Sequence, residues 1–302
     1  MPELPDIELY REALTQRILH ARLHGILLRS PFFLRTVDPP LDAVDGKSVI
    51  GVERLGKRIV IVLDDDLFLA VHLMIAGRLR WIDADVKAGL PSKIELGRAK
   101  FTTGTLIFTE ASPKKRAALF FLRGRESLAG LDPGGVEPLT CTLDDFAARL
   151  SCESRTLKRA LTDPRTFSGI GNAYSDEILH AARLSPIKLT SKLSPDEVPR
   201  LYLAVQHTLS EWTTRLRREF IDTGRFPGAG EVTAFRPDFA VHGKFGKPCP
   251  ACGHLVARIV RAENEVNYCP TCQTDGKVLA DRSLSRLLKD DWPRTVEEWE
   301  SE

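Results

Sequence analysis

The chain begins Met1-Pro2-Glu3-Leu4-Pro5-Asp6. Removal of the initiator methionine would leave a terminal proline, whose secondary amine has an ordinary pKa of about 8, well below the ~10.4 of a lysine. Such an amine is a ready nucleophile for an aldehyde-like carbon, a reaction for which enzymes usually use a lysine with a depressed pKa. Glu3 lies beside the proline and is a candidate to move protons. The alternative interpretation is a stiff lead-in to the first helix, because X-Pro pairs commonly precede helices.

The next hundred residues combine one helix with many short strands. Apolar residues at helical spacing predict a helix over about residues 6 to 20, which Asp6 can cap; they are Ile7, Tyr10, Leu14 and Ile18. From Leu23 to about Leu122, short apolar runs separated by turn signals predict a β-rich domain, a sandwich or flattened barrel. Lys57 follows Gly56 at the expected start of a strand. The runs are Val49 to Val52, Arg58 to Leu63, Leu67 to Trp81, Thr105 to Thr109 and Ala118 to Leu122.

The pattern becomes helical after Gly134-Gly135. Capping signals and periodicity predict four helices, which begin at Thr142, about residue 154, Asn172 and the capping box Ser194-Pro195-Asp196-Glu197. Two glycines precede the third helix, in Thr166-Phe167-Ser168-Gly169-Ile170-Gly171-Asn172. They allow backbone N–H groups to approach a phosphate at a helix start, or they simply turn the chain. Residues 224 to 247 are rich in glycine, proline and aromatics and are expected to form a loop.

The six cysteines divide into two groups. Cys141 and Cys152 are isolated and are expected to be inert. The other four form two Cys-x-x-Cys pairs separated by 16 residues: Cys249, Cys252, Cys269 and Cys272. This spacing predicts a zinc site rather than disulfides in a protein that is not secreted. Four thiolates close the coordination shell, so one structural, non-catalytic Zn²⁺ per chain is expected.

Charge is distributed unevenly along the chain, although the net charge is only +2. Between Thr213 and Ala262 there are nine basic and four acidic residues, a net of +5, and from Thr274 to Glu302 there are five basic and eight acidic residues, a net of −3. A basic segment beside a possible metal site suggests a polyanion partner, although charge alone favours the alternative of a solvated surface. No apolar run reaches about 18 residues, which argues against a membrane span. The N-terminus lacks a secretory signal, so a cytoplasmic protein is expected.

These stretches, taken in order, resemble the formamidopyrimidine-DNA glycosylase/endonuclease VIII family over about residues 2 to 273. The elements that carry the resemblance are Pro-Glu-Leu-Pro at the mature N-terminus, Gly56-Lys57, His72-Leu73-x-x-x-Gly77, Gly169-Ile170-Gly171-Asn172-Ala173-Tyr174 and the two cysteine pairs followed by Gln273. The resemblance implies an α+β multidomain protein. Its expected parts are an N-terminal helix with a β-sandwich catalytic domain (1–134), a helix–two-turn–helix DNA-binding domain (135–236), a β-hairpin zinc finger (237–273) and a C-terminal extension (274–302).

The resemblance also implies roles for individual residues. Pro2 would be the nucleophile, Glu3 the general acid that opens the sugar ring, and Lys57 a lysine that contacts phosphate and assists catalysis. The implied DNA-binding residues are His72, Lys114, Lys115, Arg116, Lys158, Asn172, His242 and Lys244, and Ile75 and Arg116 occupy the intercalating positions. The reacting carbon lies inside duplex DNA, so the nucleotide must be flipped out while cations hold the bent backbone. The expected protein is a monomeric, nucleoid-associated enzyme that excises oxidised bases from DNA and nicks the strand.

The chain departs from the family pattern at three places. The family's intercalation loop Pro-Arg-Arg-Phe-Gly is here Pro113-Lys114-Lys115-Arg116-Ala117, without the aromatic residue, and Ile75 replaces a methionine although Met74 is adjacent. Asn264 replaces an arginine of the finger, for which Arg258 or Arg261 could substitute. About 30 residues follow Cys272, and Leu284, Leu287 and Leu288 predict a short amphipathic helix among them, which either binds a partner or folds back on the finger.

These departures leave the lesion open. An oxidised purine such as 8-oxoguanine or formamidopyrimidine is the first expectation. An oxidised pyrimidine and a specialised abasic-site or single-strand lyase are the alternatives. The competing class is a damage-binding protein that has kept the fold and lost the chemistry.

Overall fold

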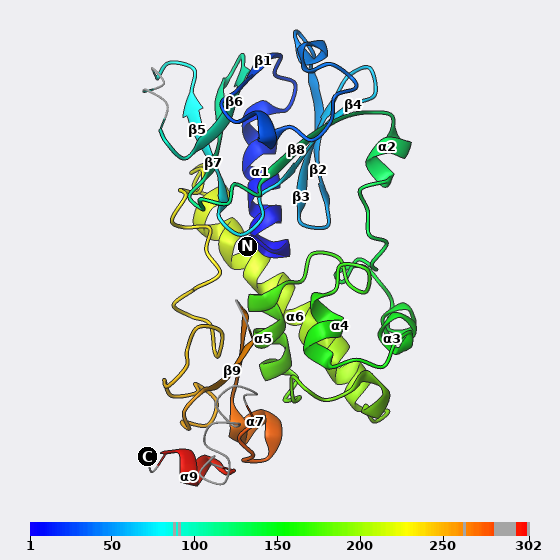
Figure 1. Ribbon diagram of the computed structural model, residues 1–302, viewed down its shortest axis with the longest axis vertical. Helices are drawn as coiled ribbons and strands as arrows, with labels where there is room; N and C mark the ends of the chain where they lie inside the picture. The colour runs from blue at the N-terminus through cyan, green and yellow to red at the C-terminus, as the bar shows by residue number, and fades with distance from the viewer. Residues whose placement is uncertain (87–88, 90–91, 262–263, 281–293, 301–302) are drawn as a thin grey trace. The chain divides into compact units, whose positions relative to one another are not determined.

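The structure, a computed structural model, describes residues 1–86, 89, 92–261, 264–280 and 294–300 (Figure 1). Contacts between residues divide the chain into two compact units. The first unit consists of Met1–Pro133 and Glu211–Ala234, and the second of Gly134–Ser210 and Phe235–Glu302. Helix α6 (Glu197–Leu216) therefore contributes residues to both units.

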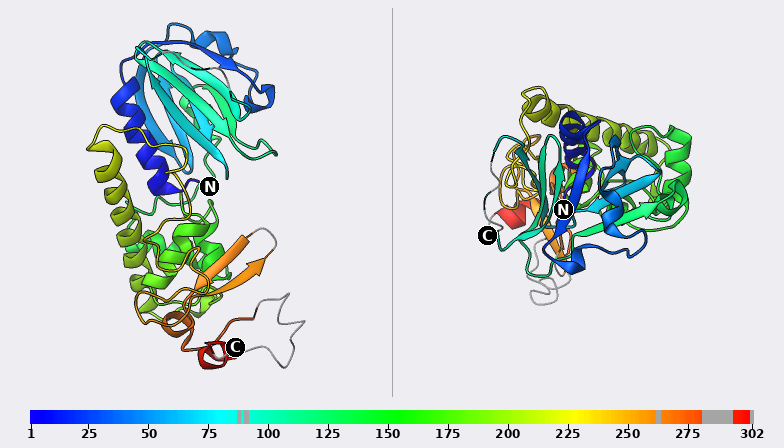
Figure 2. Two further views of the ribbon diagram at one scale, coloured as in Figure 1. Left: turned by 90° about the vertical axis from the view of Figure 1, so that its left-hand side faces the viewer. Right: turned by 90° about the horizontal axis from the view of Figure 1, so that it is seen from above.

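The first unit is a β-sandwich with one long helix, as the sequence predicts (Figures 1 and 2). One sheet has the strand order β1-β6-β7-β5 and the other β2-β3-β4-β8, with antiparallel neighbours throughout. The strands are β1 (Leu23–Leu28), β2 (Val49–Leu55), β3 (Arg58–Leu63), β4 (Leu67–His72), β5 (Gly77–Asp83), β6 (Glu95–Phe101), β7 (Gly104–Glu110) and β8 (Ala118–Arg123). Short 3₁₀ helices lie at Pro31–Phe33 and Leu41–Val44, and α2 (Arg125–Ala129) follows β8.

Strand β3 shows how the sandwich is packed. Successive side chains of a strand point to opposite faces of the sheet. Ile59 and Ile61 accordingly join the large core that also includes α1, whereas Val60 and Val62 pack on the other face with Leu128 of α2. Both faces of this sheet are covered, which explains why the run from Arg58 to Leu63 is continuously apolar rather than alternating.

Helix α1 (Leu4–Ile18) starts two residues earlier than the periodicity predicts. Ile7, Tyr10, Leu14 and Ile18 are all fully buried, so the predicted apolar face is confirmed. The predicted cap is wrong, because the N-cap is Glu3 and Asp6 lies in the first turn. The apolar run from Leu67 to Trp81 also proves to be two strands, β4 and β5, separated by a turn, and β6 was not predicted.

The second unit contains helices, the cysteine-rich module and the end of the chain. Its elements are α3 (Leu143–Ser151), α4 (Leu157–Thr162), α5 (Asn172–Ala181), the 3₁₀ helix Thr190–Lys192, β9 (Ala257–Arg261), β10 (Asn264–Tyr268), α7 (Pro270–Thr274) and α9 (Val296–Glu300). Thr142 caps α3 with Asp145 in a reciprocal capping box, as expected. The predicted start near residue 154 is too early, because Thr156 is the N-cap of α4 and is bridged to Leu189.

The cysteine-rich module is a β-hairpin followed by a short helix. Strands β9 and β10, called the finger hairpin below, pair antiparallel from Asn264 opposite Arg261 to Tyr268 opposite Ala257. The amphipathic helix predicted around Leu284, Leu287 and Leu288 lies outside the described residues. Among the helices that the structure describes, none has the length and apolar character needed to cross a membrane.

Candidate nucleic-acid interface and metal centre

The N-terminus of the chain is buried against the start of α1. Pro2 and Glu3 are both buried, Glu3 with 3% of its surface exposed. The backbone nitrogen of Glu3 donates to Oδ2 of Asp6 at 2.9 Å, and the two residues form a capping box. This arrangement satisfies orphan N–H groups of the first turn and fixes both carboxylates beside the terminus.

The electrostatic environment of the terminus favours a neutral amine. Burial lowers the pKa of the α-amine at Met1, and the positive charges of Arg78 and Lys57 lower it further. The carboxylates of Glu3 and Asp6 act in the opposite direction. A neutral amine is the nucleophilic form, so the site suits attack on an electrophilic carbon once the terminal nitrogen is that of a proline.

Lys57 and His72 lie at the ends of neighbouring strands. Lys57 was expected at the start of a strand, but it lies with Gly56 in the two-residue turn between β2 and β3. The φ of +60° at Gly56 suits the first position of such a turn. His72 ends β4 and pairs with Arg58. Burial lowers the pKa of His72 to about 4, with further lowering by Arg58 and Lys57. His72 is therefore a neutral imidazole near pH 7.

Ile75 lies at the turn between β4 and β5 with 59% of its surface exposed. The turn is tightly built, because a Cβ on Gly77 would lie 2.1 Å from the carbonyl oxygen of Leu73. Nη1 of Arg78 braces the turn by donating to the carbonyl oxygens of Ile75, at 3.1 Å, and Gly77, at 2.6 Å. The buried Nε of Arg78 has no protein partner.

The three consecutive cations between β7 and β8 are held by Glu110. Its buried carboxylate accepts hydrogen bonds from the backbone nitrogens of Arg116, at 3.0 Å, and Ala117, at 2.9 Å. Lys115 folds back so that its Nζ donates to the carbonyl oxygen of Glu110. Lys114 and Arg116 are exposed, so two of the three predicted DNA-binding cations are presented to solvent.

Strand register brings these parts to one end of the sandwich. His72 pairs with Arg58 on one side and with Ala118 on the other, while Gly77 pairs with Glu110 in the second sheet. The β2–β3 turn, the β4–β5 turn and the β7–β8 loop therefore share that end. The structure thus groups these predicted residues at one end of the sandwich, and the charge of Lys57 acts on the terminal amine.

In the second unit, Asn172 is the first residue of α5, as predicted. The loop before it is anchored by Phe167 and Ile170, which are fully buried. Nδ2 of Asn172 donates to the carbonyl oxygen of Glu265 in β10 at 3.0 Å. The side chain predicted to bind phosphate therefore also links the start of α5 to the finger hairpin.

Asp176, one turn further along α5, is the centre of a buried polar cluster. It is fully buried and accepts hydrogen bonds from Nζ of Lys158 and from the backbone nitrogen of Asn267. Its Oδ2 also lies 2.7 Å from Nδ1 of His242. Nζ of Lys158 donates in addition to the carbonyl oxygen of Asn172 at 2.6 Å. Lys158 and His242, both predicted DNA-binding residues, are thus held inward by one carboxylate.

The neighbouring Glu177 shapes the loop that carries His242 and Lys244. Its carboxylate accepts three backbone hydrogen bonds at 2.7 to 2.9 Å, from Ala240, Val241 and His242. Burial raises the pKa of Glu177, and these N–H groups oppose the shift. Lys244 folds over the same loop, with its Nζ 2.6 Å from the carbonyl oxygen of Pro237.

The four cysteines of the finger converge as predicted. The Sγ atoms of Cys249, Cys252, Cys269 and Cys272 all lie within 4.8 Å of one another. Zinc–sulfur bonds of about 2.3 Å in a tetrahedron place sulfurs about 3.8 Å apart, and the separations Cys252–Cys269 and Cys249–Cys272 are 3.4 and 3.9 Å. Burial raises the pKa of the Cys269 thiol and raises that of Cys272 to about 12, so a bound cation is needed to hold these residues as thiolates. The cluster fits one structural zinc ion.

A histidine that the sequence does not single out lies beside this cluster. Nε2 of His180, at the end of α5, is 3.2 Å from Sγ of Cys249. Asn172, Asp176 and His180 are spaced by four residues and therefore share one face of α5. That face contacts the finger hairpin and the cysteine cluster at successive turns.

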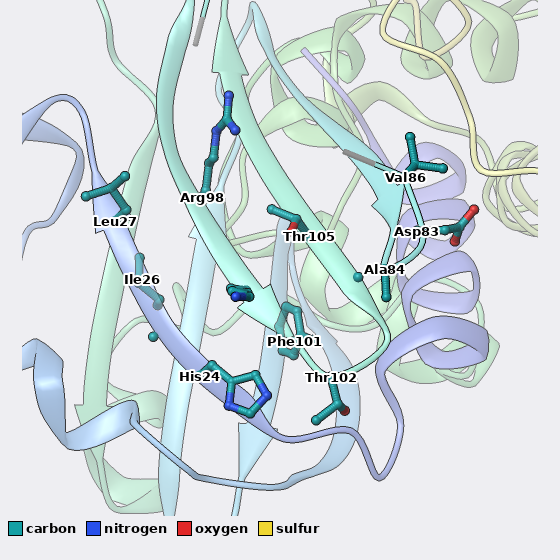
Figure 3. A pocket seen from close by; sticks show the side chains of 13 residues that line it. His24, Ile26, Leu27, Asp83, Ala84, Val86, Arg98, Phe101, Thr102 and Thr105 are labelled. Atoms are coloured by element: carbon teal, nitrogen blue, oxygen red, sulfur yellow. The ribbon is translucent and has the colours of Figure 1, made fainter. Parts of the chain in front are cut away.

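A separate hollow of about 730 Å³ lies in the first unit beside β1, β6 and β7 (Figure 3). Figure 3 shows His24, Phe101 and Thr102 along it, with Arg98 further up. Arg98 is paired with Glu95. None of the predicted site residues lines this hollow.

Sequence reasoning missed the residues that organise the site. Arg78, Glu110, Asp176 and His180 each position a predicted residue or its loop. Asp6 was expected only to cap the helix, and its contact with Glu3 was not predicted. A signal was available for Asp176, since Ser175-Asp176-Glu177 places two acids one helical turn after Asn172. No comparable pattern marks Arg78 or Glu110, whose side chains bond to backbone atoms of the adjoining turn or loop.

Comparison with known proteins assigns three parts of the chain. Residues 1–133 match the model described as the formamidopyrimidine-DNA glycosylase N-terminal domain, residues 134–216 its H2TH domain, and residues 246–274 the zinc finger found in FPG and IleRS. A formamidopyrimidine-DNA glycosylase of Desulfitobacterium hafniense is 31% identical over 277 residues, which is 90% of this chain and 100% of that protein.

Two solved structures of the Lactococcus lactis Fpg protein are also similar. One is a complex with DNA containing FAPY-dG, with a TM-score of 0.77 and 25% identity. The other is a complex with DNA containing an oxidised pyrimidine, with a TM-score of 0.77 and 26% identity. Each covers 90% of this chain and 100% of the solved chain.

Proposed function

The chain belongs to the formamidopyrimidine-DNA glycosylase family, and we propose that it is a base-excision repair enzyme, a bifunctional DNA glycosylase and AP lyase that acts at the nucleoid. The observation that carries this proposal is the N-terminal site. A buried carboxylate, Glu3, lies next to Pro2, and burial, followed by the charges of Arg78 and Lys57, lowers the pKa of the α-amine at Met1. Such a constellation suits imine chemistry at a sugar carbon.

The chemistry begins with the free nitrogen of Pro2. It attacks C1′ of the damaged nucleotide, the C1′–base bond breaks, and the base leaves with the proton that the attacking amine releases. Glu3 donates a proton to the sugar ring oxygen, so that the ring opens and a cationic imine forms between Pro2 and C1′. Loss of a proton from C2′ then expels the 3′ phosphate, because the imine accepts the electron pair. A second elimination expels the 5′ phosphate, and water hydrolyses the imine to release the enzyme.

Cations at the same end of the sandwich hold the DNA backbone during these steps. Lys57, Lys114 and Arg116 supply positive charge, and Ile75 is the exposed apolar residue that enters the base stack. His72 is neutral, so it contributes a hydrogen bond to phosphate rather than a charge. In the second unit, the loop ending at Asn172 supplies backbone N–H groups at a helix start. The zinc ion, when bound, contributes only structure, because four thiolates leave no open position.

An oxidised purine is the proposed lesion, and an oxidised pyrimidine is the alternative. The loop Lys114-Lys115-Arg116 has no aromatic side chain, and this favours as a further alternative a lyase that works on abasic or single-stranded sites. A panel of duplex and single-stranded oligonucleotides separates the three. Cleavage of 8-oxoguanine duplexes well above that of abasic duplexes supports the first proposal. Equal rates on both would contradict it, and strand cleavage at abasic sites alone would favour the lyase.

A non-catalytic damage-binding protein is the competing function. It predicts binding to the same oligonucleotides with no release of base and no nicking. Product analysis by gel and by mass distinguishes the two classes, since a binding protein leaves the strand intact at every enzyme concentration.

A further inference from the structure

The finger hairpin has two faces with different neighbours. Successive side chains of β10 point to opposite faces. Asn267 is turned toward α5, where its backbone nitrogen and Nδ2 donate to Asp176 at 3.1 and 3.4 Å. Tyr268 is turned the other way and is fully buried with Ala257 and Ile259 of β9. A hairpin of two five-residue strands therefore carries a small apolar core on the face opposite Asn267.

The C-terminal extension completes that core. Leu279 and Trp299 are the residues of the extension that pack against the cluster of Ala257, Ile259 and Tyr268. The backbone nitrogen of Leu279 donates to the hydroxyl of Tyr268 at 2.7 Å, which satisfies a buried phenol. Tyr268 directly precedes the zinc ligand Cys269, so the contact lies next to the metal centre.

The chain returns to the hairpin in a defined way. Residues 276–278 and 294–296 lie side by side in an antiparallel bridge between Lys277 and Thr295. Its two backbone hydrogen bonds run from Val278 to Arg294 at 3.0 Å and from Val296 to Gly276 at 2.9 Å. Helix α9 then starts with a capping box, in which the backbone nitrogens of Glu298 and Thr295 bond to each other's side chains at 3.3 Å. These contacts fix the direction of α9, which places Trp299 on the hairpin.

Trp299 also reaches the loop that precedes the first cysteine. Its ring centroid is 6.1 Å from that of Phe245. The guanidinium of Arg258 lies over the ring of Phe245, 4.2 Å from the ring centroid. Trp299 therefore contacts both the apolar core of the hairpin and the aromatic ring on which a cation of β9 rests.

A two-stranded hairpin of this length is marginally stable by itself. The zinc-finger model ends at residue 274, so the extension lies beyond all three matched family domains. We propose that the C-terminal extension is a second support of the finger hairpin and that Trp299 is the residue that positions the hairpin before DNA binds. The expected effect on DNA binding rests on the function proposed above. The expected support of the hairpin is independent of that function.

The experiment compares three full-length zinc-loaded variants with the parent protein. Trp299→Ala removes the ring, Trp299→Phe keeps an aromatic side chain, and Glu297→Gln changes an exposed residue of the same helix as the control. Hydrogen–deuterium exchange is followed without DNA for the amides of residues 257–268. We expect at least tenfold faster exchange in Trp299→Ala, largely restored protection in Trp299→Phe and parent-like exchange in Glu297→Gln. Unchanged exchange in Trp299→Ala would overturn the proposal.

The second measurement separates positioning from chemistry. Affinity for an abasic duplex is expected to fall about tenfold in Trp299→Ala, because ordering the hairpin then accompanies binding. The single-turnover rate at saturating enzyme is expected to stay within twofold of the parent. A fall in that rate with unchanged affinity would contradict a positioning role. If the parent protein does not bind or cleave the duplex, the proposed function fails while the exchange experiment still decides the support of the hairpin.

Discussion

The backbone nitrogen of Glu3 and the carboxylate of Asp6 are joined by a buried hydrogen bond of 2.9 Å. This bond makes Glu3 the N-cap of α1 and holds its carboxylate at the terminus, where the proposed nucleophile lies. The position of Glu3, the proposed general acid, therefore depends on a structural residue in the first turn of a helix.

Replacement of Asp6 tests that dependence. Asp6→Ala removes the acceptor and is expected to cost about 1 kcal/mol of unfolding free energy. It is also expected to lower the rate of base release about tenfold or more, because Glu3 loses its fixed orientation. Asp6→Asn keeps an acceptor oxygen and should recover much of both losses. Urea unfolding and single-turnover base release measure the two effects; an unimpaired rate in Asp6→Ala would refute the positioning of Glu3 by this bond.

The depressed pKa of His72 predicts a stability that depends on pH. Its folded pKa of about 4 lies below the ordinary 6.5, so folding favours the neutral imidazole. That contribution is fully present above pH 6.5 and is lost as the pH falls toward 4. His72→Asn should therefore lose less stability than the parent between pH 7 and pH 5, by about 1 to 2 kcal/mol after allowance for partial solvent screening. Parallel denaturant titrations at the two pH values measure it, and identical losses would count against a buried neutral imidazole.

The contact between Lys158 and Asp176 predicts strong coupling in the second unit. Asp176→Asn leaves the buried Lys158 without its charge partner and is expected to cost about 3 to 5 kcal/mol. Lys158→Met in the same background should cost much less than it does alone, because no uncompensated charge remains. A double-mutant cycle by chemical unfolding gives the coupling energy. Additive single and double changes would show that the two side chains do not act as a pair.

The contact between His180 and Cys249 predicts that zinc is released more slowly than it would be from the four cysteines without this histidine. A hydrogen bond from a neighbouring group to a ligand typically changes metal affinity 10- to 100-fold. His180→Phe is therefore expected to release zinc to a chromogenic chelator about tenfold faster, and His207→Ala, an exposed change on α6, should not. In cobalt-substituted protein, the thiolate-to-cobalt absorption band should also shift. Equal release rates and an unmoved band would remove His180 from the account.

Local signals predicted much of the fold. The apolar stripe of α1, the limits of β3 and the Thr142 cap follow from periodicity and capping, which depend on residues close together in sequence. Strand β6 was missed because its sequence, Glu95-Leu96-Gly97-Arg98-Ala99-Lys100-Phe101, contains three charged residues and no clean alternation. Glu95 and Arg98 form an ion pair that only the folded strand reveals. The turn that divides the run from Leu67 to Trp81 into β4 and β5 was missed because the residues around Ile75 are apolar, and only tertiary packing reveals the turn.

The parts of the candidate site that a local sequence motif defines were predictable. The four cysteines were found because their spacing alone defines a metal site, and the structure confirms that they converge. Asn172 was found from the glycines that precede a helix start, and its role was implied by the family resemblance. The residues that hold the site were not predictable, because their partners are distant in sequence. Asp176, for example, contacts Lys158, His242 and Asn267, which lie up to 91 positions away. The roles of the predicted DNA-binding residues stay predictions.

The most direct test of Pro2 as the nucleophile is mass spectrometry of the protein after borohydride reduction in the presence of an abasic duplex. We expect a covalent protein–DNA adduct whose cross-linked peptide begins at Pro2, with Met1 absent. An adduct on Lys57 or another lysine, or an active protein that retains Met1 on every chain, would contradict Pro2 as the nucleophile.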